Sequence, residues 1–413
     1  MRVRQQLIKK RLDRRFVERT VELAKSSQGF GSGVLRAALD SSPLWGAGRV
    51  EDTYNLLGHA VGKALSVLAT QPGRELSEVH QAAGAKLLQG ASLKAALDLN
   101  WEDPAERVRG LQQVIEMLQS AQRWFDGGAA AETCPEASAY LATARQIQQQ
   151  DVEVNEDGKP QLRRGVARHR RISVSDPHMR HGRKSRRQRI DGYKQHILKD
   201  LDSQPIYAVG VTPANVPEAW VTDALDSDLK AMGVTLGELH IDRAYLNSKW
   251  VRQRSPALTV YCKAWPVRSL GGRFSKAAFV LDWEHQTLTC PHQVVLPFSP
   301  GKTVRFPART CQACPERERC TTSVGGRSVS IHPDERFLQE LRQRQLTPSG
   351  LAQLRKRVTV EHSLAHLSAW QRQQARYRTL RKNLFDARRY AIIHNLHVWM
   401  RCPNPLDSPS WVS

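Results

Sequence analysis

Three acidic residues lie where a chain can bring carboxylates together around divalent metal ions. Asp40 and Asp242 each end an apolar run, and Glu361 lies on the strongly helical segment 351–371. Open α/β sheets keep their chemistry at the carboxyl ends of buried strands. Mg²⁺ prefers carboxylate oxygens, and two such ions can hold the attacking and leaving oxygens of a phosphodiester. We therefore predict a two-metal site in which Asp40, Asp242 and Glu361 are the catalytic residues and the Mg²⁺ ligands.

Local sequence leaves an alternative for Asp40. The turn-rich stretch 41–48 follows it, so we expect Asp40 at a strand end rather than in the middle of a strand. An aspartate in that place could serve only to accept backbone hydrogen bonds from the turn.

Four of the seven cysteines are spaced as metal ligands are. Cys311 and Cys314, separated by two residues, lie between Cys290 and Cys320. Seven cysteines are too few for a disulfide framework in 413 residues, whereas this spacing fits a four-thiolate zinc site. Four free thiols are the alternative. Zinc would order a strand-poor, zinc-ribbon-like insert over residues 283–325 and would be structural rather than catalytic.

The chain is strongly basic, with 62 Lys and Arg against 40 Asp and Glu and a formal net charge of +22. This balance favours a polyanionic partner, because Lys and Arg side chains that contact phosphates release condensed counterions. A basic protein without a nucleic-acid partner is the alternative. Residues 163–189 hold eleven basic residues and one acid, which predicts a phosphate-binding rim. The rim residues expected to contact DNA are Arg180, Arg183, Lys184, Arg186 and Arg187.

Three further polar residues are candidate contacts near the carboxylates. Lys184, Lys194 and His196 could contact a phosphate or a water there, and ordinary packing is the alternative for each.

The chain has no run of 18 apolar residues, and its first residues lack the apolar core of a signal peptide. We therefore expect an intracellular protein, cytoplasmic and associated with the nucleoid.

The predicted elements form a mixed α/β core that is interrupted by inserts. Residues 51–150 read as helical throughout, and residues 341–370 and 380–400 are predicted to form closing helices. A hairpin is expected to turn at Asp157 and Gly158. The expected core strands are 34–40, 193–200, 206–212, 236–242 and 257–262.

Several motifs in a fixed order resemble the DDE transposases of bacterial insertion sequences, which have an RNase H-like catalytic domain. The resemblance runs from about Lys9 to Met400. Besides the cysteine cluster, the motifs are Leu39-Asp-Ser-Ser42, Asp176-Pro-His-Met-Arg180, Gly192-Tyr-Lys-Gln-His196, Val211-Thr-Pro-Ala-Asn215, Asp242-Arg-Ala-Tyr245, Val360-Glu-His362 and Ala375-Arg-Tyr-Arg378.

The resemblance implies a fold, a reaction and partners. The fold would be an RNase H-like mixed sheet flanked by helices, and the catalytic triad would be Asp40, Asp242 and Glu361. The enzyme would use Mg²⁺ or Mn²⁺ to free a 3′-hydroxyl at the element end and join it to target DNA. A homodimer or larger oligomer would hold two ends. Arg357, four residues before the glutamate, matches an arginine that can contact a phosphate and is therefore expected to bind DNA.

Asp176 is a rival for the first carboxylate, because Asp-Pro also ends a short run that reads as a strand, 171–175. We prefer Asp40 because the strand 192–200, which follows Asp176, already fills the second place in the expected sheet order.

The sequence departs from the family pattern at several positions. Ala244 replaces the usual glycine of the second motif, and Leu354 and Ser368 stand where some relatives have tyrosine and lysine. The chain also starts almost on the region 10–15, before which relatives carry a further helical segment. An inactive, N-terminally truncated remnant that only binds DNA is therefore the alternative function. An RNA-binding zinc-ribbon protein without chemistry would leave the three acids unexplained.

These interpretations give a domain organisation. We expect residues 1–33 to be the remnant of a helical DNA-binding region, 34–50 and 151–400 the catalytic domain, 51–150 an all-α insert, 283–325 the four-cysteine insert and 401–413 a tail.

Overall fold

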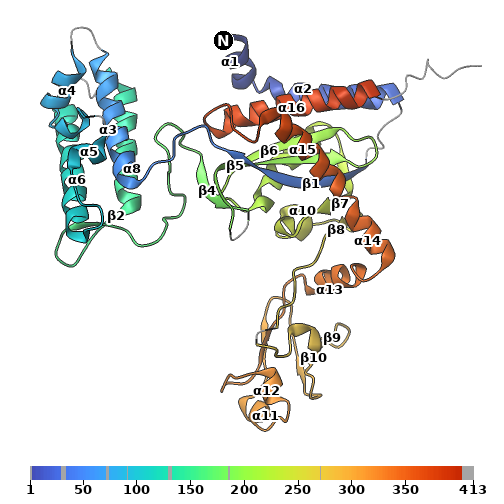
Figure 1. Cartoon of the computed structure of the whole chain (residues 1–413). Coiled ribbons are helices and arrows are strands. Elements are labelled where there is room, and N and C mark those ends of the chain that lie inside the picture. The colour runs from blue at the N-terminus through green and yellow to red at the C-terminus, as the bar shows by residue number, and fades with distance from the viewer. Residues whose placement is uncertain are drawn as a thin grey trace, which may run out of the picture.

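A central α/β body carries two lobes, one on its side and one below it (Figure 1). The computed structural model describes residues 2–28, 34–70, 74–90, 92–128, 133–184, 187–269 and 271–401. We call the three parts the sheet domain, the helical lobe (53–151) and the cysteine lobe (266–334). The predicted tail and the predicted DNA-binding region therefore lie partly outside the described residues, at 402–413 and 29–33.

The sheet domain is built on a mixed six-stranded sheet, so the predicted mixed α/β architecture is confirmed. The strand order is β4-β5-β1-β7-β8, and β6 pairs with β5. Strand β1 is antiparallel to β5 and parallel to β7. The bounds are β1 (Val34–Trp45), β4 (Arg180–Arg183), β5 (Arg189–Asp200), β6 (Ile206–Pro213), β7 (Thr235–Ile241) and β8 (Thr259–Tyr261).

Central strand β1 is buried on both faces at Ala37, Ala38 and Leu39, which fits the apolar side chains at these positions. Leu39 packs on one face in a cluster that includes Leu225 of α9 (Thr222–Ala231) and Leu341 of α13 (Glu335–Arg344). Ala38 points to the opposite face, where the cluster includes Val360 of α15 (Val358–Gln371). Because successive side chains of a strand alternate between faces, each helix layer fixes the register of β1.

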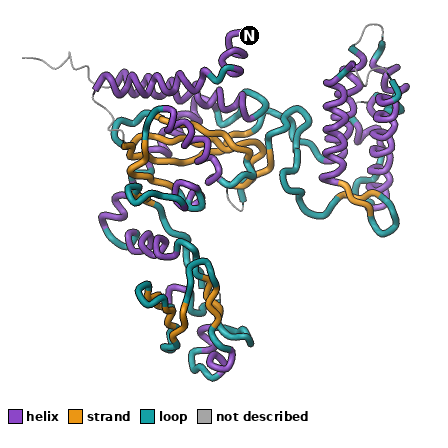
Figure 2. Tube along the Cα trace, turned by 180° about the vertical axis from the view of Figure 1, so that it is seen from behind, coloured by secondary structure: helices purple, strands orange, loops and turns teal. Residues whose placement is uncertain are grey.

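Helices cover the sheet on both faces, and the long helices α2 and α16 lie side by side (Figures 1 and 2). The helices of the sheet domain are α1 (Arg2–Lys9), α2 (Leu12–Gln28), η2 (Glu218–Val221), α9 (Thr222–Ala231), η3 (Arg243–Tyr245), α10 (Lys249–Arg252), α13 (Glu335–Arg344), α14 (Pro348–Arg355), α15 (Val358–Gln371) and α16 (Leu380–Arg401). No helix in the described part of the chain combines the length and the apolar character needed to span a membrane.

The helices predicted over 341–370 are present as α13, α14 and α15. The chain begins a new helix at α14 because Thr347 caps it by accepting from Gly350 N and Pro348 occupies its first turn. One other sequence prediction about this domain is wrong. Residues 171–175 form no strand. This stretch instead follows the helical lobe, and Arg171 N donates to Gln150 Oε1 at 2.9 Å.

Helix α2 is tied into the sheet domain by a buried ion network. Asp13 is only 2% exposed and pairs with Arg381 and Arg388 of α16. Arg388 also pairs with Asp228 of α9 at 2.9 Å. Residues 12–28 are therefore part of the packing of this domain, and a DNA-binding role for residues 1–33 stays a prediction.

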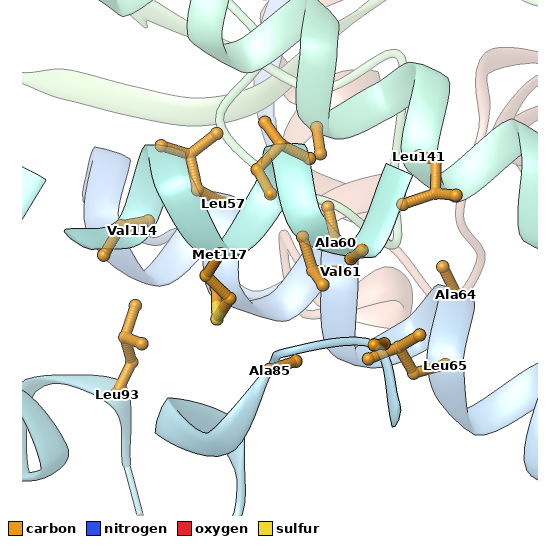
Figure 3. Close-up of a cluster of buried hydrophobic side chains, with 14 of the residues drawn as sticks. Leu57, Ala60, Val61, Ala64, Leu65, Ala85, Leu93, Val114, Met117 and Leu141 are labelled. Atoms are coloured by element: carbon orange, nitrogen blue, oxygen red, sulfur yellow. The ribbon is translucent and has the colours of Figure 1, made fainter. Parts of the chain in front are cut away.

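The helical lobe has its own apolar core (Figure 3). Leu57 and Val61 of α3 meet Val114 and Met117 of α6 there, and Leu141 of α8 closes the cluster. The elements are α3 (Thr53–Ala69), α4 (Leu76–Ala82), η1 (Lys86–Leu88), α5 (Leu93–Leu97), α6 (Pro104–Asp126) and α8 (Pro135–Asp151), followed by the hairpin β2 (Val152–Val154) and β3 (Pro160–Leu162). Residues 51–150 hold 12 acidic and 8 basic residues, so this part of a basic chain is net negative.

The two connections between the helical lobe and the sheet domain are held together at the base of the lobe. Thr53 Oγ1 donates to Asp151 Oδ2 at 2.8 Å. Arg170 donates to both oxygens of Asp151, at 2.7 and 2.8 Å. Glu51 N donates to Ile172 O at 3.3 Å. The entering and leaving chains are thereby clasped side by side.

The cysteine lobe is inserted between β8 and α13. Its small core includes Phe279, Leu288, Phe298 and Phe306. The elements are η4 (Lys276–Ala278), β9 (Val280–Asp282), β10 (Thr287–Thr289), β11 (Val295–Pro297), β12 (Thr303–Arg305), α11 (Ala308–Gln312), α12 (Arg317–Cys320) and β13 (Ser328–Ser330).

Removing Asp13 should destabilise the protein strongly. Asp13→Ala leaves Arg388, whose side chain is 9% exposed, without one of its two carboxylate partners. Breaking a buried pair in this way costs about 3–5 kcal/mol, which urea unfolding would measure. Glu22→Ala is the control, because the Arg19–Glu22 pair is exposed and should matter by less than about 1 kcal/mol. Equal losses for the two variants would contradict this account of α2.

Candidate active site

The parallel ladder between β1 and β7 ends one residue before each of the two aspartates. Its last pair is Leu39 with Ile241. Asp40 is therefore the next residue on β1. Asp242 directly follows β7 and is the N-cap of η3, where its Oδ1 accepts from Arg243 N at 2.7 Å. Two neighbouring strands thus deliver both carboxylates to the same end of the ladder.

The sequence predicted that Asp40 lies at a strand end, and this prediction is wrong. Strand β1 continues to Trp45, because β5 stays paired with it as far as Gly192. The backbone of Trp45 is also held by two bonds to the segment after α15, from Trp45 N to Gln373 O and from Ala375 N to Trp45 O. Asp40 Oδ1 accepts from Ser41 N at 2.8 Å, so the local hydrogen bond of the alternative interpretation exists alongside the site.

Glu361 reaches the site from α15, which is fixed by its buried face and by one sheet residue. Val360 and Leu367 are buried against the sheet, which leaves Glu361 on the exposed side. Lys199 of β5 donates to Ser363 Oγ at 2.8 Å and to Thr359 O at 3.3 Å. Burial lowers the pKa of Lys199 to about 8. These bonds hold α15, the helix that carries Glu361, against strand β5 of the sheet.

The three predicted carboxylates line one cavity of about 840 Å³. Arg357 lies between two of them, pairing with Asp40 Oδ2 and with Glu361 Oε1, the latter at 2.6 Å. Lys184 lines the same cavity. In this arrangement the described residues contain no group of three or more histidine, cysteine or carboxylate side chains close enough to hold a metal ion.

The electrostatics of Asp40 suit a bound cation. Burial raises its pKa to about 6, Arg357 opposes the shift, and Glu361 and Asp242 add to it. A carboxylate that is 15% exposed beside two others needs positive charge to stay ionised. The oxygen donors fit a hard divalent cation in chemistry, and Arg357 balances part of the charge in this structure.

A buried hydrogen-bond network lies under the aspartates. Tyr245, the last residue of η3, bonds through its hydroxyl to His196 Nδ1 at 2.8 Å, and His196 Nε2 bonds to Thr212 Oγ1 at 2.9 Å. Burial lowers the pKa of His196 to about 3, so the ring is neutral. The interpretation of His196 as a phosphate contact is wrong, because the residue is fully buried and both nitrogens have partners.

Some of the basic residues predicted to bind DNA are exposed, and others bond to groups within the fold. Lys184, Arg183 and Arg187 are exposed, and Arg186 lies outside the described residues. In contrast, Arg180 donates to Pro177 O and Met179 O at 2.7 and 2.8 Å. Lys194 likewise donates to Val216 O at 3.1 Å and lies 3.5 Å from Glu218. The structure gives Arg180 and Lys194 partners inside the fold.

The rival carboxylate, Asp176, has a structural environment. It is fully buried, accepts from the Tyr193 hydroxyl at 2.6 Å and from Thr379 N at 3.2 Å, and does not line the cavity of the other acids. Its position beside Tyr193 joins the segment before β4 to the start of α16.

The four cysteines of the predicted zinc site line a separate cavity in the cysteine lobe. Cys290 Sγ accepts from Val294 N at 3.3 Å, and Cys311 Sγ accepts from Arg327 N at 3.5 Å. Burial raises the pKa of Cys320, and the other three cysteines add to the shift. Although they share this cavity, the sulfurs do not lie close enough together to form a metal-binding group within the described residues.

Sequence reasoning missed two supports of the site, Lys199 and the Tyr245–His196 pair. Lys199 lies inside the buried stretch 195–200, and a lysine among strand residues is a usable signal because a buried lysine needs partners. Tyr245 belongs to the motif Asp242-Arg-Ala-Tyr245, but nothing in the sequence pairs it with a strand residue 49 positions away.

Comparison with known families gives a match for one segment of the chain. The family model for the transposase DDE domain matches residues 289–400. Among the site residues, Glu361, Arg357 and the four cysteines lie within the matched segment of the transposase domain, whereas Asp40 and Asp242 precede it. Neither the curated proteins nor the solved structures gave a match to the chain.

Stability should fall in acid because His196 is buried in its neutral form. The pKa of His196 is lowered to about 3 in the folded protein. An unfolded histidine has a pKa of about 6.5, so between these values the unfolded chain binds more protons. The contribution is complete above pH 6.5 and is lost as the pH falls toward 3. The test is to measure the unfolding free energy against pH for the native protein and for His196→Gln. The variant lacks the titrating ring and should lose less stability between pH 6.5 and 3, so parallel curves would rule the account out.

Proposed function

We propose that the protein is a transposase of a bacterial insertion sequence that hydrolyses phosphodiesters at element ends and transfers the strand into target DNA. The observation that carries the proposal is the meeting of Asp40, Asp242 and Glu361 at one cavity in a chain whose residues 289–400 match the transposase DDE domain. The strand order β6-β5-β1-β7-β8, with only β5 antiparallel to its neighbours, supports an RNase H-like catalytic domain.

The three carboxylates would hold Mg²⁺ or Mn²⁺, which would supply charge stabilisation for the attacking and leaving oxygens. The residues of the chain position the substrate. Lys184 is exposed at the cavity and can bind a phosphate there. Arg357 can exchange its carboxylate partners for a DNA phosphate, because its guanidinium already lies among the three acids.

General affinity for DNA comes from the net charge of +22. A homodimer or larger oligomer on DNA is part of the proposal, because joining two element ends requires that both are held at once.

Ala244, which replaces a glycine of the family pattern, does not have a positive φ, so its methyl group causes no backbone strain.

The proposal includes a structural zinc ion held by Cys290, Cys311, Cys314 and Cys320. Its support is the shared cavity and the two backbone N–H groups that donate to Cys290 and Cys311 sulfurs, since such donors stabilise thiolates. Zinc would join α11 and α12 to the end of β10 in a lobe whose own core is small.

The zinc prediction is about one ion per chain in the purified protein. Cys314→Ser should lose the ion and lower the melting temperature, whereas Cys262→Ser, which changes a buried cysteine outside the cluster, should keep it. Elemental analysis checks both variants. Absence of zinc together with free titration of all four thiols in the native protein would exclude the site.

Neutralising each acid tests the proposed activity. Asp40→Asn, Asp242→Asn and Glu361→Gln should each abolish Mg²⁺- or Mn²⁺-dependent nicking of supercoiled DNA, because losing a ligand removes several kcal/mol of charge stabilisation. A double variant should be hardly worse than a single one, since the residues act as a unit. The nicked positions can be mapped by sequencing the DNA ends.

Two controls accompany this series. Asp223→Asn changes an exposed carboxylate on α9, and Asp176→Asn changes the rival residue; both should keep the activity if they fold. Loss of nicking in Asp176→Asn but not in Asp40→Asn would reassign the first carboxylate. A native protein that binds DNA with a steep salt dependence but nicks nothing with either metal would identify an inactive DNA-binding remnant.

A further inference from the structure

A second hollow adjoins the catalytic cavity on the other side of Asp242 and Arg357, and these two residues line both hollows. It lies between the ends of β7 and β8 and helices α14 and α15, and its volume is about 390 Å³. Pockets that enclose small ligands span roughly 300–1,000 Å³, so this hollow takes a ligand of nucleotide size and not a duplex.

The rim of the hollow carries basic side chains without acidic partners. Arg243, Lys263 and Arg355 line it, and none forms an ion pair in the described part of the chain. Lys263 and Arg355 are exposed, and Arg243 Nε is buried without a hydrogen-bond acceptor. Such unpaired guanidinium and ammonium groups are suited to an anionic oxygen.

The floor of the same hollow is apolar. Leu351 and Val358 are 43% and 42% exposed, and Leu354 lies half-buried between them in sequence. Tyr261 also lines the hollow, but its ring is already stacked on His240 with centroids 4.7 Å apart. The aliphatic side chains are therefore the surface on which a flat apolar group can lie.

We propose that this hollow is a subsite for one unpaired nucleotide of the DNA strand next to the scissile phosphate. A strand whose phosphate lies at the three acids must leave the catalytic cavity past the residues that border it. A nucleotide combines a base, which fits the aliphatic floor, with a phosphate, which fits the basic rim. The inference rests on the proposed function, because it assigns the path of that reaction's substrate.

Photocrosslinking tests the subsite in a variant that should bind DNA without cleaving it. The DNA is a duplex centred on a mapped nicking position, with 5-iodouracil placed at each of the nucleotides that flank the scissile phosphate. It is bound to the Glu361→Gln variant, and the crosslinked peptides are sequenced. We expect one flanking position to crosslink to residues 351–358 or 261–263. Crosslinks from all flanking positions to other segments would overturn the subsite.

Abasic DNA provides a kinetic test in the native protein. Removing the base at the crosslinking position should slow cleavage roughly 5- to 100-fold, the range expected when one base loses its contact with a protein surface. Leu354→Asp should slow cleavage of normal DNA to a similar degree and be insensitive to the abasic change. A native protein equally fast on both DNAs would refute the proposal.

A matched pair of arginine variants separates the rim from general charge. Arg355 and Arg252 are both exposed and without an ionic partner in the described residues, but Arg252 lines a hollow that contains no catalytic acid. Arg355→Ala should lower kcat/KM for cleavage, while Arg252→Ala should change only the salt-dependent affinity. Equal effects would refute the rim assignment. A native protein that cleaves nothing refutes the proposed function and the substrate path that rests on it. If cleavage occurs but residues 351–358 and 261–263 are not crosslinked, the proposed function stands and the subsite alone is refuted.

Discussion

The register between β1 and β7 is the constraint on which the site depends. Leu39 pairs with Ile241, so the two aspartates follow the last shared position of the ladder. A slip of one residue would turn Asp40 to the opposite face of the sheet, away from Glu361. The register is held by apolar side chains on both faces, Leu39 toward α9 and α13 and Ala38 toward α15. Packing far from the cavity therefore determines whether the three acids meet.

Successive side chains of β1 point to opposite faces of the sheet, and the two faces differ in their surroundings near the site. Asp40 points to the face of α15, where Arg357 and Glu361 provide charge. Ser41 points to the other face, where its side chain bonds with Tyr245. One side is polar and open to a substrate, and the other is closed and neutral. The side-chain contact that holds η3 against β1, between Ser41 and Tyr245, therefore does not involve the carboxylates.

Much of this arrangement could be predicted from local sequence, and its failures have a common cause. Apolar runs predicted the core strands, and the two aspartates that follow these runs, Asp40 and Asp242, line the cavity. The sequence did not predict that β1 continues past Asp40, because the partners of Trp45 lie after α15, more than 300 residues away. The same holds for Lys199 beneath Thr359 and Ser363. Hydrogen bonds between distant segments leave no pattern in local sequence, whereas burial does.

The helical lobe gives the molecule an electric dipole. Residues 51–150 carry 12 acidic and 8 basic residues, which leaves 28 acidic and 54 basic residues in the rest of the chain. The lobe stands beside the sheet domain and not within it (Figure 1). In the field of a polyanion, such a molecule rotates so that its negative end points away. The basic remainder of the chain therefore faces the polyanion, and added salt, by shortening the Debye length, weakens this alignment together with the attraction.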